Sequence, residues 1–399
     1  MKAWVKETGD ETRFYDRAMA ASVVMIVISV VVDRFILFVP AAMLLLLVGM
    51  GKIYDRYSGK KLFFHHEKKT IRLFPGESTS LKLQIENGSR FPMLNGRLSF
   101  HTGNSVKNME RQTIDKEDYH YKLPLTLHGK GAAYLNLPLE AVHRGTTKVK
   151  HVSFTYPHII TFIPVRLTYQ KPVHTEFLVY PELVPIMGVD EYFHRRSGAH
   201  HAPESIVEDP SSPAGVRDYI SGDSIKRIHW KASAKAQTLK TKILEKQMNK
   251  EMTIFINLTQ HSRLGHAYRS GQLERLLSAA GSFCMKAAHF EVPYELFVNV
   301  KRPHQASIFK QESGEGALHV KHSLELLARV DKSFPVQEMS PVMYKWDQQT
   351  EKKNTVVIVG DVDGEMKDIL HEWQWKGRNI LILETEKDAA FLYAWKRRR

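Results

Sequence analysis

Thr253-Ile-Phe-Ile-Asn-Leu258 and the stretch at 272–289 that follows it decide the fold class of this chain. Four of its six residues are apolar and three of these are consecutive, which is typical of a strand buried on both faces. The later stretch repeats apolar side chains at helical spacing, from Leu273 to Ala288. Apolar strands and amphipathic helices go on alternating to residue 395, with strands at 294–300, 355–359 and 380–383 and helices near 317–330 and 365–375. The region 251–395 is therefore predicted to be an α/β domain with a largely parallel sheet.

Upstream, residues 62–188 show a different pattern. Apolar and polar side chains alternate one by one, as in Leu81-Lys-Leu83-Gln-Ile85, and Pro-Gly and Asn-Gly pairs interrupt the runs. Period-two alternation between turn signals predicts antiparallel strands. The number and spacing of these strands predict an all-β sandwich of the immunoglobulin-like kind.

The first part of the chain carries two uncharged apolar runs, 18–32 and 35–51, separated by Asp33 and Arg34. We interpret 18–51 as a transmembrane helical hairpin that follows a cytoplasmic segment, 1–17. Each run is slightly shorter than the ~20 residues that a bilayer core usually requires. A buried helical hairpin in a soluble core is the alternative.

The charge distribution agrees with this interpretation. Of the net charge of +14, residues 1–69 contribute +4, residues 215–250 contribute +6 and the tail 396–399 contributes +4. Apart from Arg34 between the two runs, the nearby basic residues lie before the first run and after the second: Lys2, Lys6, Arg13, Arg17, Lys52, Arg56, Lys60, Lys61, Lys68 and Lys69. By the positive-inside bias, both flanks are cytoplasmic. The prediction is a cell-membrane protein with two spans and a large cytoplasmic region.

Residues 189–250 form the predicted connector between the β and α/β regions. Its first part, 190–214, is rich in Pro, His and Ser and is expected to be irregular. The adjacent His200 and His201 point to different sides of any regular element, so we expect solvent-exposed residues there rather than a metal site.

The segment Gly215-Val-Arg217-Asp-Tyr219-Ile-Ser-Gly222-Asp223-Ser-Ile-Lys-Arg227-Ile228-His229-Trp230-Lys231-Ala-Ser233-Ala234 is the densest in chemistry. We expect Asp223 or Ser224 to cap a helix that would carry Arg227 and Lys231 on one face. Three interpretations stay open for this segment: a polar seam between domains, a protein-binding surface, and a site for anionic lipid or nucleic acid.

The same residues strongly resemble the signature of the bacterial domain-of-unknown-function family 58 (DUF58). The matching positions are Arg217, Tyr219, Gly222, Asp223, Ile228, His229, Trp230, Lys231, Ser233 and Ala234. The resemblance implies a membrane hairpin, a β domain, the signature and a von Willebrand factor A-like (Rossmann-like) α/β domain, in that order. It also implies a MoxR-type AAA+ ATPase as the cytosolic partner. The expected partner or interdomain contacts are Arg217, Tyr219, Gly222, Asp223, Arg227, His229, Trp230, Lys231 and Ser233.

Von Willebrand A-like domains can hold a divalent cation in an Asp-x-Ser-x-Ser loop after the first strand. This chain has Asn257-Leu-Thr259 there, whose neutral oxygens suit such a cation poorly. Asn257, Thr259 and Asp361 are therefore only weak metal candidates, and we expect no metal and no cofactor.

Enzyme motifs are missing from the sequence. It contains no phosphate loop, no Gly-x-Ser-x-Gly elbow and no His-Glu-x-x-His. Its one cysteine, Cys284, falls in the amphipathic stretch and is expected to be an inert apolar filler. His229 and Ser233 are four residues apart and could pair as base and nucleophile, but no third group completes a site.

The leading hypothesis is a membrane-anchored, non-enzymatic interaction protein that presents its α/β domain to a MoxR-type ATPase or its clients. The alternative is binding of anionic lipid or nucleic acid through residues 215–250 and the basic tail. A hydrolase centred on His229 and Ser233 ranks last.

Overall fold

A computed structural model describes residues 3–7, 11–32, 35–108, 112–115, 118–198, 208–246, 251–261, 267–302, 307–350 and 355–395. The tail 396–399, the pair Asp33 and Arg34, and His200 and His201 lie outside the described residues. The chain divides into two compact units, Met1–Tyr180 and Pro181–Arg399.

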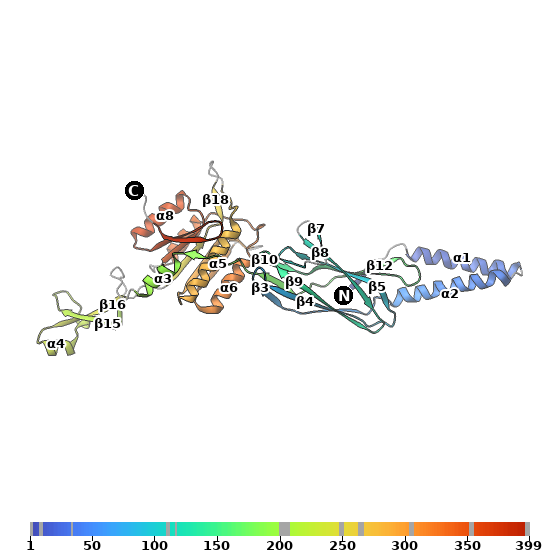
Figure 1. Ribbon diagram of the computed structural model, residues 1–399, viewed down its shortest axis with the longest axis horizontal. Helices are drawn as coiled ribbons and strands as arrows, with labels where there is room; N and C mark the ends of the chain where they lie inside the picture. Colours follow the sequence, from blue (N-terminus) through green and yellow to red (C-terminus); the bar gives the residue numbers. More distant parts are fainter. Residues whose placement is uncertain are drawn as a thin grey trace. The chain divides into compact units, whose positions relative to one another are not determined.

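In the first unit two helices, α1 (Glu11–Val31) and α2 (Phe35–Tyr57), pack against each other and coincide with the two apolar runs (Figure 1). One segment, Phe38–Tyr57 of α2, is long and apolar enough to cross a membrane, and only 22% of its apolar window is buried. Among the residues that the structure describes, there is thus one candidate membrane-spanning helix near the N-terminus.

The rest of the first unit is made of strands. A six-stranded antiparallel sheet has the order β1-β12-β11-β5-β8-β7, a four-stranded one β2-β4-β9-β6, and a small mixed sheet β10-β13-β3. One apolar core joins strands of all three sheets, which is why apolar side chains alternate along them. The strands are β1 (Trp4–Glu7), β2 (Leu62–His66), β3 (Thr70–Leu73), β4 (Ser78–Asn87), β5 (Met93–Gly103), β6 (Val106–Lys107), β7 (Gln112–Asp115), β8 (Asp118–Leu127), β9 (Ala132–Ala141), β10 (Gly145–Lys148), β11 (Lys150–Pro157), β12 (Pro164–Tyr169) and β13 (Glu176–Val179).

Strand β1 precedes both helices, yet it is the edge strand beside β12. Trp4, only 7% exposed, packs against Phe64 and Tyr169, and Lys6 Nζ lies 2.7 Å from Asp55 Oδ1. The segments before α1 and after α2 therefore belong to one β structure.

The second unit contains a seven-stranded sheet with the order β14-β24-β23-β22-β17-β20-β21, whose central strands β23, β22, β17 and β20 are parallel. Alternate side chains of β17 serve two cores: Ile254 and Ile256 face α3, α5 and α6, while Phe255 faces α7 and α8. The predicted parallel sheet with helices on both faces is thus observed. The elements are β14 (Ile186–Met187), α3 (Val189–Gly198), β17 (Met252–Ile256), β18 (Thr259–His261), β19 (Ala267–Arg269), α5 (Leu273–His289), β20 (Tyr294–Lys301), β21 (Ile308–Gly314), α6 (Gly316–Ala328), α7 (Ser340–Gln349), β22 (Thr355–Val359), α8 (Gly364–Trp375), β23 (Ile380–Thr385) and β24 (Ala390–Ala394).

The prediction of an irregular connector at 190–214 was partly wrong. Helix α3 occupies its beginning, because Val189 and Phe193 bury apolar side chains against the sheet despite their polar neighbours. Strand β15 (Glu208–Asp218) occupies its end and pairs with β16 (Lys240–Lys246).

Candidate functional site

The signature residues form a small substructure of their own, which we call the signature module (residues 208–246). It consists of the hairpin β15–β16 with a short 3₁₀ helix, η1 (Ile225–Arg227), and a short α-helix, α4 (Trp230–Ala236), between its strands. The side chains of residues 215–243 are described.

Asp223 holds the turn of the module together. Its carboxylate accepts hydrogen bonds from Arg217 Nη2 at 2.6 Å, from the Ile220 amide at 3.1 Å and from Thr241 Oγ1 at 3.1 Å. The Arg217 guanidinium lowers the pKa of Asp223 to about 2. Gly222 beside it has a backbone φ of +113°, which residues other than glycine rarely adopt. Arg217, Gly222 and Asp223 thus build the scaffold.

His229 and Ser233 have structural partners too. His229 Nδ1 accepts from the Ala232 amide at 3.1 Å and caps α4. Ser233 Oγ donates to the His229 carbonyl at 3.1 Å and accepts from the Lys240 amide at 2.9 Å. The two side chains share no bond, so the nucleophile–base geometry is not formed.

The expected cap at Asp223 or Ser224 was wrong. The helix begins only at Trp230, because Ile228 is extended and pairs with Thr241 across the hairpin. Arg227 therefore lies in η1 and does not share a helix face with Lys231.

Of the remaining signature side chains, Ile228 is buried, while Trp230, Lys231 and Ala234 face solvent. Trp230 is 66% exposed, Lys231 is exposed and Tyr219 is half-buried. The module also has a hollow of about 440 Å³ lined by Val216, Ala232, Lys235, Ala236 and Lys240. The module therefore combines an internally bonded scaffold with an exposed apolar and basic surface.

The carboxyl edge of the parallel sheet is closed by neutral side chains. Asn257 and Thr259, each 1% exposed, surround the fully buried Asn299. Asn299 Nδ2 lies 2.8 Å from Asn257 Oδ1, 2.7 Å from Thr259 Oγ1 and 2.7 Å from the Gln337 carbonyl, and Asn299 Oδ1 accepts from the Leu258 amide at 2.8 Å. The oxygens that a metal would need are engaged in this network.

Asn299 was missed by sequence reasoning. Strand β20 pairs in parallel with β17, which aligns Val298 with Ile256 and brings Asn299 beside Asn257. The one signal was a polar residue inside the apolar run Val298-Asn-Val300.

The two aspartates at this edge have separate roles. Asp361 contributes its backbone carbonyl to Asn257 Nδ2 at 2.7 Å, and Asp363 caps α8 by accepting from the Met366 amide at 2.8 Å. In the described part of the chain, no three His, Cys, Asp or Glu side chains are grouped so that they could hold a metal ion.

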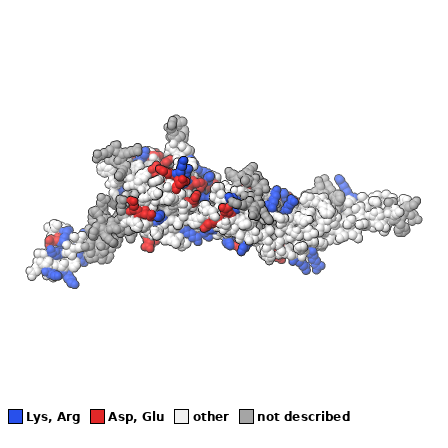
Figure 2. Space-filling model, viewed as in Figure 1, with Lys and Arg blue, Asp and Glu red and all other residues white. Residues whose placement is uncertain are grey.

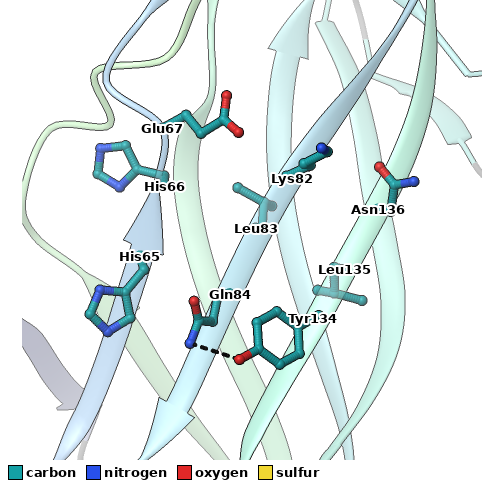
Figure 3. Close-up of a pocket in the computed structure, with 9 residues that line it drawn as sticks. All are labelled: His65, His66, Glu67, Lys82, Leu83, Gln84, Tyr134, Leu135 and Asn136. Atoms are coloured by element: carbon teal, nitrogen blue, oxygen red, sulfur yellow. Dashed lines mark hydrogen bonds between the residues drawn. The ribbon is translucent and has the colours of Figure 1, made fainter.

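Two further features are a surface hollow on the β unit, which is the strand-rich part of Met1–Tyr180, and the burial of Cys284. A hollow of about 540 Å³ lies on strands β2, β4 and β9. Figure 3 shows the side chains that line it, among which Gln84 Nε2 donates to Tyr134 Oη at 3.5 Å. Cys284 is fully buried in α5, and burial raises the pKa of its thiol to about 12. The expectation of a buried filler is confirmed.

Fold and site define a protein with a β unit, an apolar helical segment, and an α/β unit that carries the signature module. Residues 215–384 match the family model described as "Protein of unknown function DUF58", so the chain carries a domain of this family and the resemblance read from its signature is confirmed. No curated protein matches the sequence.

Similarity to solved structures is weak. A protein from Corynebacterium diphtheriae described as membrane anchored has 15% identity and a TM-score of 0.23, and the match covers 31% of this chain and 33% of that one. A non-cellulosomal cohesin from Archaeoglobus fulgidus has 11% identity and a TM-score of 0.19, with 34% of this chain and 97% of that one covered. The chain thus spans about a third of the Corynebacterium protein.

Proposed function

We propose that this chain is a membrane-anchored, non-enzymatic interaction protein whose cytosolic partner is a MoxR-type AAA+ ATPase or a client of it. The partner follows from the family resemblance. The α/β unit would be the von Willebrand A-like domain that the resemblance implies, and the β unit the immunoglobulin-like domain.

The surface of the helices supports the anchor. Apolar side chains of both helices are exposed along their length, among them Val27 at 56%, Val30 at 70%, Val39 at 67% and Leu46 at 61%. Removing such side chains from water is favourable in a bilayer.

Strand pairing supports two spans rather than one. If α2 alone crossed the membrane, the segment before α1 would lie on the side opposite the β unit. Yet β1 is bonded to β12 from Trp4 to Glu7, and β1 and β2 lie in one unit. An even number of crossings between them agrees with this pairing, which supports a second crossing by α1. The basic flanks, including Lys6, Lys52 and Arg56, favour the cytoplasm for that side.

The observation that carries the interaction role is the exposure of Trp230. Buried aromatic anchors dominate protein interfaces, and a tryptophan that is two-thirds exposed stabilises its own fold little. Arg217, in contrast, is engaged with Asp223, so its removal would disturb the module itself.

The test is a pull-down of the ATPase from membranes that contain the full chain. Trp230→Ala is expected to lower recovery at least about tenfold, as for an interface hot spot. Trp375→Ala is the matched control, because Trp375 is 83% exposed at the end of α8. Equal recovery with both variants would refute the role of Trp230, and no recovery with the unmodified chain would refute the partner.

A further inference from the structure

The signature module leaves most of its apolar surface uncovered. Of its described side chains, residues 215–243, only Ile228, Ser233 and Thr241 are buried. A two-stranded hairpin with so small a core is only marginally stable in water by itself. The large apolar side chains that remain exposed are Val216, Ile220, Ile225, Trp230, Leu239 and Ile243.

The hollow of about 440 Å³ is the concave part of this surface. Strand β15 contributes Val216, helix α4 contributes Ala232, Lys235 and Ala236, and β16 contributes Lys240. Two alanines and a valine make an apolar floor that is large enough for one or two aliphatic side chains. Lys235 puts a positive charge at the same place, whereas the charge of Lys240 is balanced by Asp218.

Residues 215–243 contain seven Lys and Arg but only two Asp and no Glu. Both aspartates are already paired, Asp218 with Lys240 at 2.5 Å and Asp223 with Arg217 at 2.6 Å. Among the described residues no carboxylate pairs with Lys235. Figure 2 shows acidic as well as basic side chains on the visible face of the α/β unit. Residues 251–395 contain 17 Lys and Arg against 19 Asp and Glu, so the basic excess belongs to the module.

We propose that this hollow binds a segment of a protein partner in which carboxylate side chains stand next to aliphatic ones. The aliphatic side chains would rest on Val216, Ala232 and Ala236, and a carboxylate would pair with Lys235, because Lys240 is already paired with Asp218. The proposal rests on the proposed function and names the docking element and the partner's chemistry.

The surface suits a peptide better than nucleic acid or lipid. Single-stranded nucleic acid is held by several aromatic rings that stack on bases. Here Trp230 is the one large aromatic exposed among the described module residues, and the others are aliphatic. A bilayer surface would meet protruding side chains, whereas Ala232 and Ala236 line a hollow.

The test uses the full chain in detergent micelles and a fluorescein-labelled peptide in which Glu and Leu alternate. Lys235→Glu is expected to raise the Kd about fivefold to tenfold, because an attractive pair becomes a repulsive one. Ala236→Trp fills the hollow without changing charge and is expected to raise it at least about tenfold. Lys226→Glu makes the same charge change at a lysine of η1 outside the hollow and is expected to change the Kd less than about twofold.

Two further probes define the ligand. A peptide with Ser in place of Leu is expected to bind at least about tenfold more weakly, because the apolar floor is then unused. Phosphatidylglycerol vesicles and single-stranded DNA are expected to bind the unmodified chain and Lys235→Glu alike. Three results would overturn the proposal. Lys226→Glu and Lys235→Glu could weaken peptide binding equally, or the Ser peptide could bind as tightly as the Leu peptide. Alternatively, Lys235→Glu could lose vesicle or DNA binding rather than peptide binding. Hydrogen exchange at the Thr241 amide checks that each variant keeps the module folded.

The same variants separate this proposal from the proposed function. If Ala236→Trp loses the peptide but recovers the ATPase from membranes like the unmodified chain, the hollow is not the docking element, although the adaptor role stands. If the unmodified chain binds the peptide but recovers no ATPase, the partner is wrong and the hollow stands.

Discussion

Replacing Asn299 by leucine should loosen the carboxyl edge of the parallel sheet. The substitution nearly preserves volume but removes the hub of the network, which is fully buried. Without Asn299, three members of the network keep another hydrogen-bond partner: Asn257, Thr259 and the Gln337 carbonyl. The Leu258 amide loses its partner Asn299 Oδ1 and has no other in this network. An orphaned buried amide costs about 1–3 kcal/mol, and each further bond lost costs about 0.5–1.5 kcal/mol. We expect a loss of about 3–5 kcal/mol, a large fraction of the stability of a typical domain.

The assay is hydrogen exchange of the β17 amides in the full chain, which reports the free energy of opening where the network lies. Asn379→Leu is the control, because Asn379 is exposed and donates one bond to Tyr192 Oη at 3.0 Å. Its expected cost is less than about 0.5 kcal/mol. If Asn299→Leu cost as little as the control, the network would not hold the strand ends, and a ligand-binding role for these side chains would have to be reconsidered.

Three other predictions test the anchor, the module and the cysteine. Leu46→Arg puts a charge on an exposed apolar position of α2 at a cost of about 2.5–3.5 kcal/mol in a bilayer centre, so the membrane fraction in carbonate extraction should fall, while Lys60→Ala should leave it unchanged. Because Arg217 lowers the pKa of Asp223 to about 2, the stabilising contribution of the Asp223 carboxylate should be constant above pH 5 and be lost as the pH falls from about 4 towards 2. The free energy of opening, measured by hydrogen exchange at the Thr241 amide, should show this decrease, and the decrease should be absent in Asp223→Asn. Cys284, whose thiol pKa is raised to about 12 by burial, should resist iodoacetamide at pH 8 until urea unfolds the chain; alkylation of the native chain would contradict the packing of α5.

Local periodicity predicted the parts of the fold that depend on one buried face. Alternation in β4 and β9 and helical spacing in α5 and α8 were visible because each element buries its own apolar side. Helix α3 was hidden, because its anchors Val189 and Phe193 are followed by polar residues. Strand β1 was hidden for another reason: Trp4 becomes a core residue only through Phe64 and Tyr169, which are distant in sequence.

The signature shows most clearly what a motif can and cannot reveal. Its residue types were compatible with a polar seam, a partner surface and an anion site, since Arg, His, Trp and Lys can serve in all three. The structure divides the motif by exposure. Arg217, Asp223, His229 and Ser233 bond within the module, while Trp230 is exposed. These internal hydrogen bonds hold one short helix, α4, in place, and the side chains that α4 exposes best explain why the module needs them. We therefore place the proposed contact on α4 and its hollow, and not on the edge of the sheet where the Asn299 network lies.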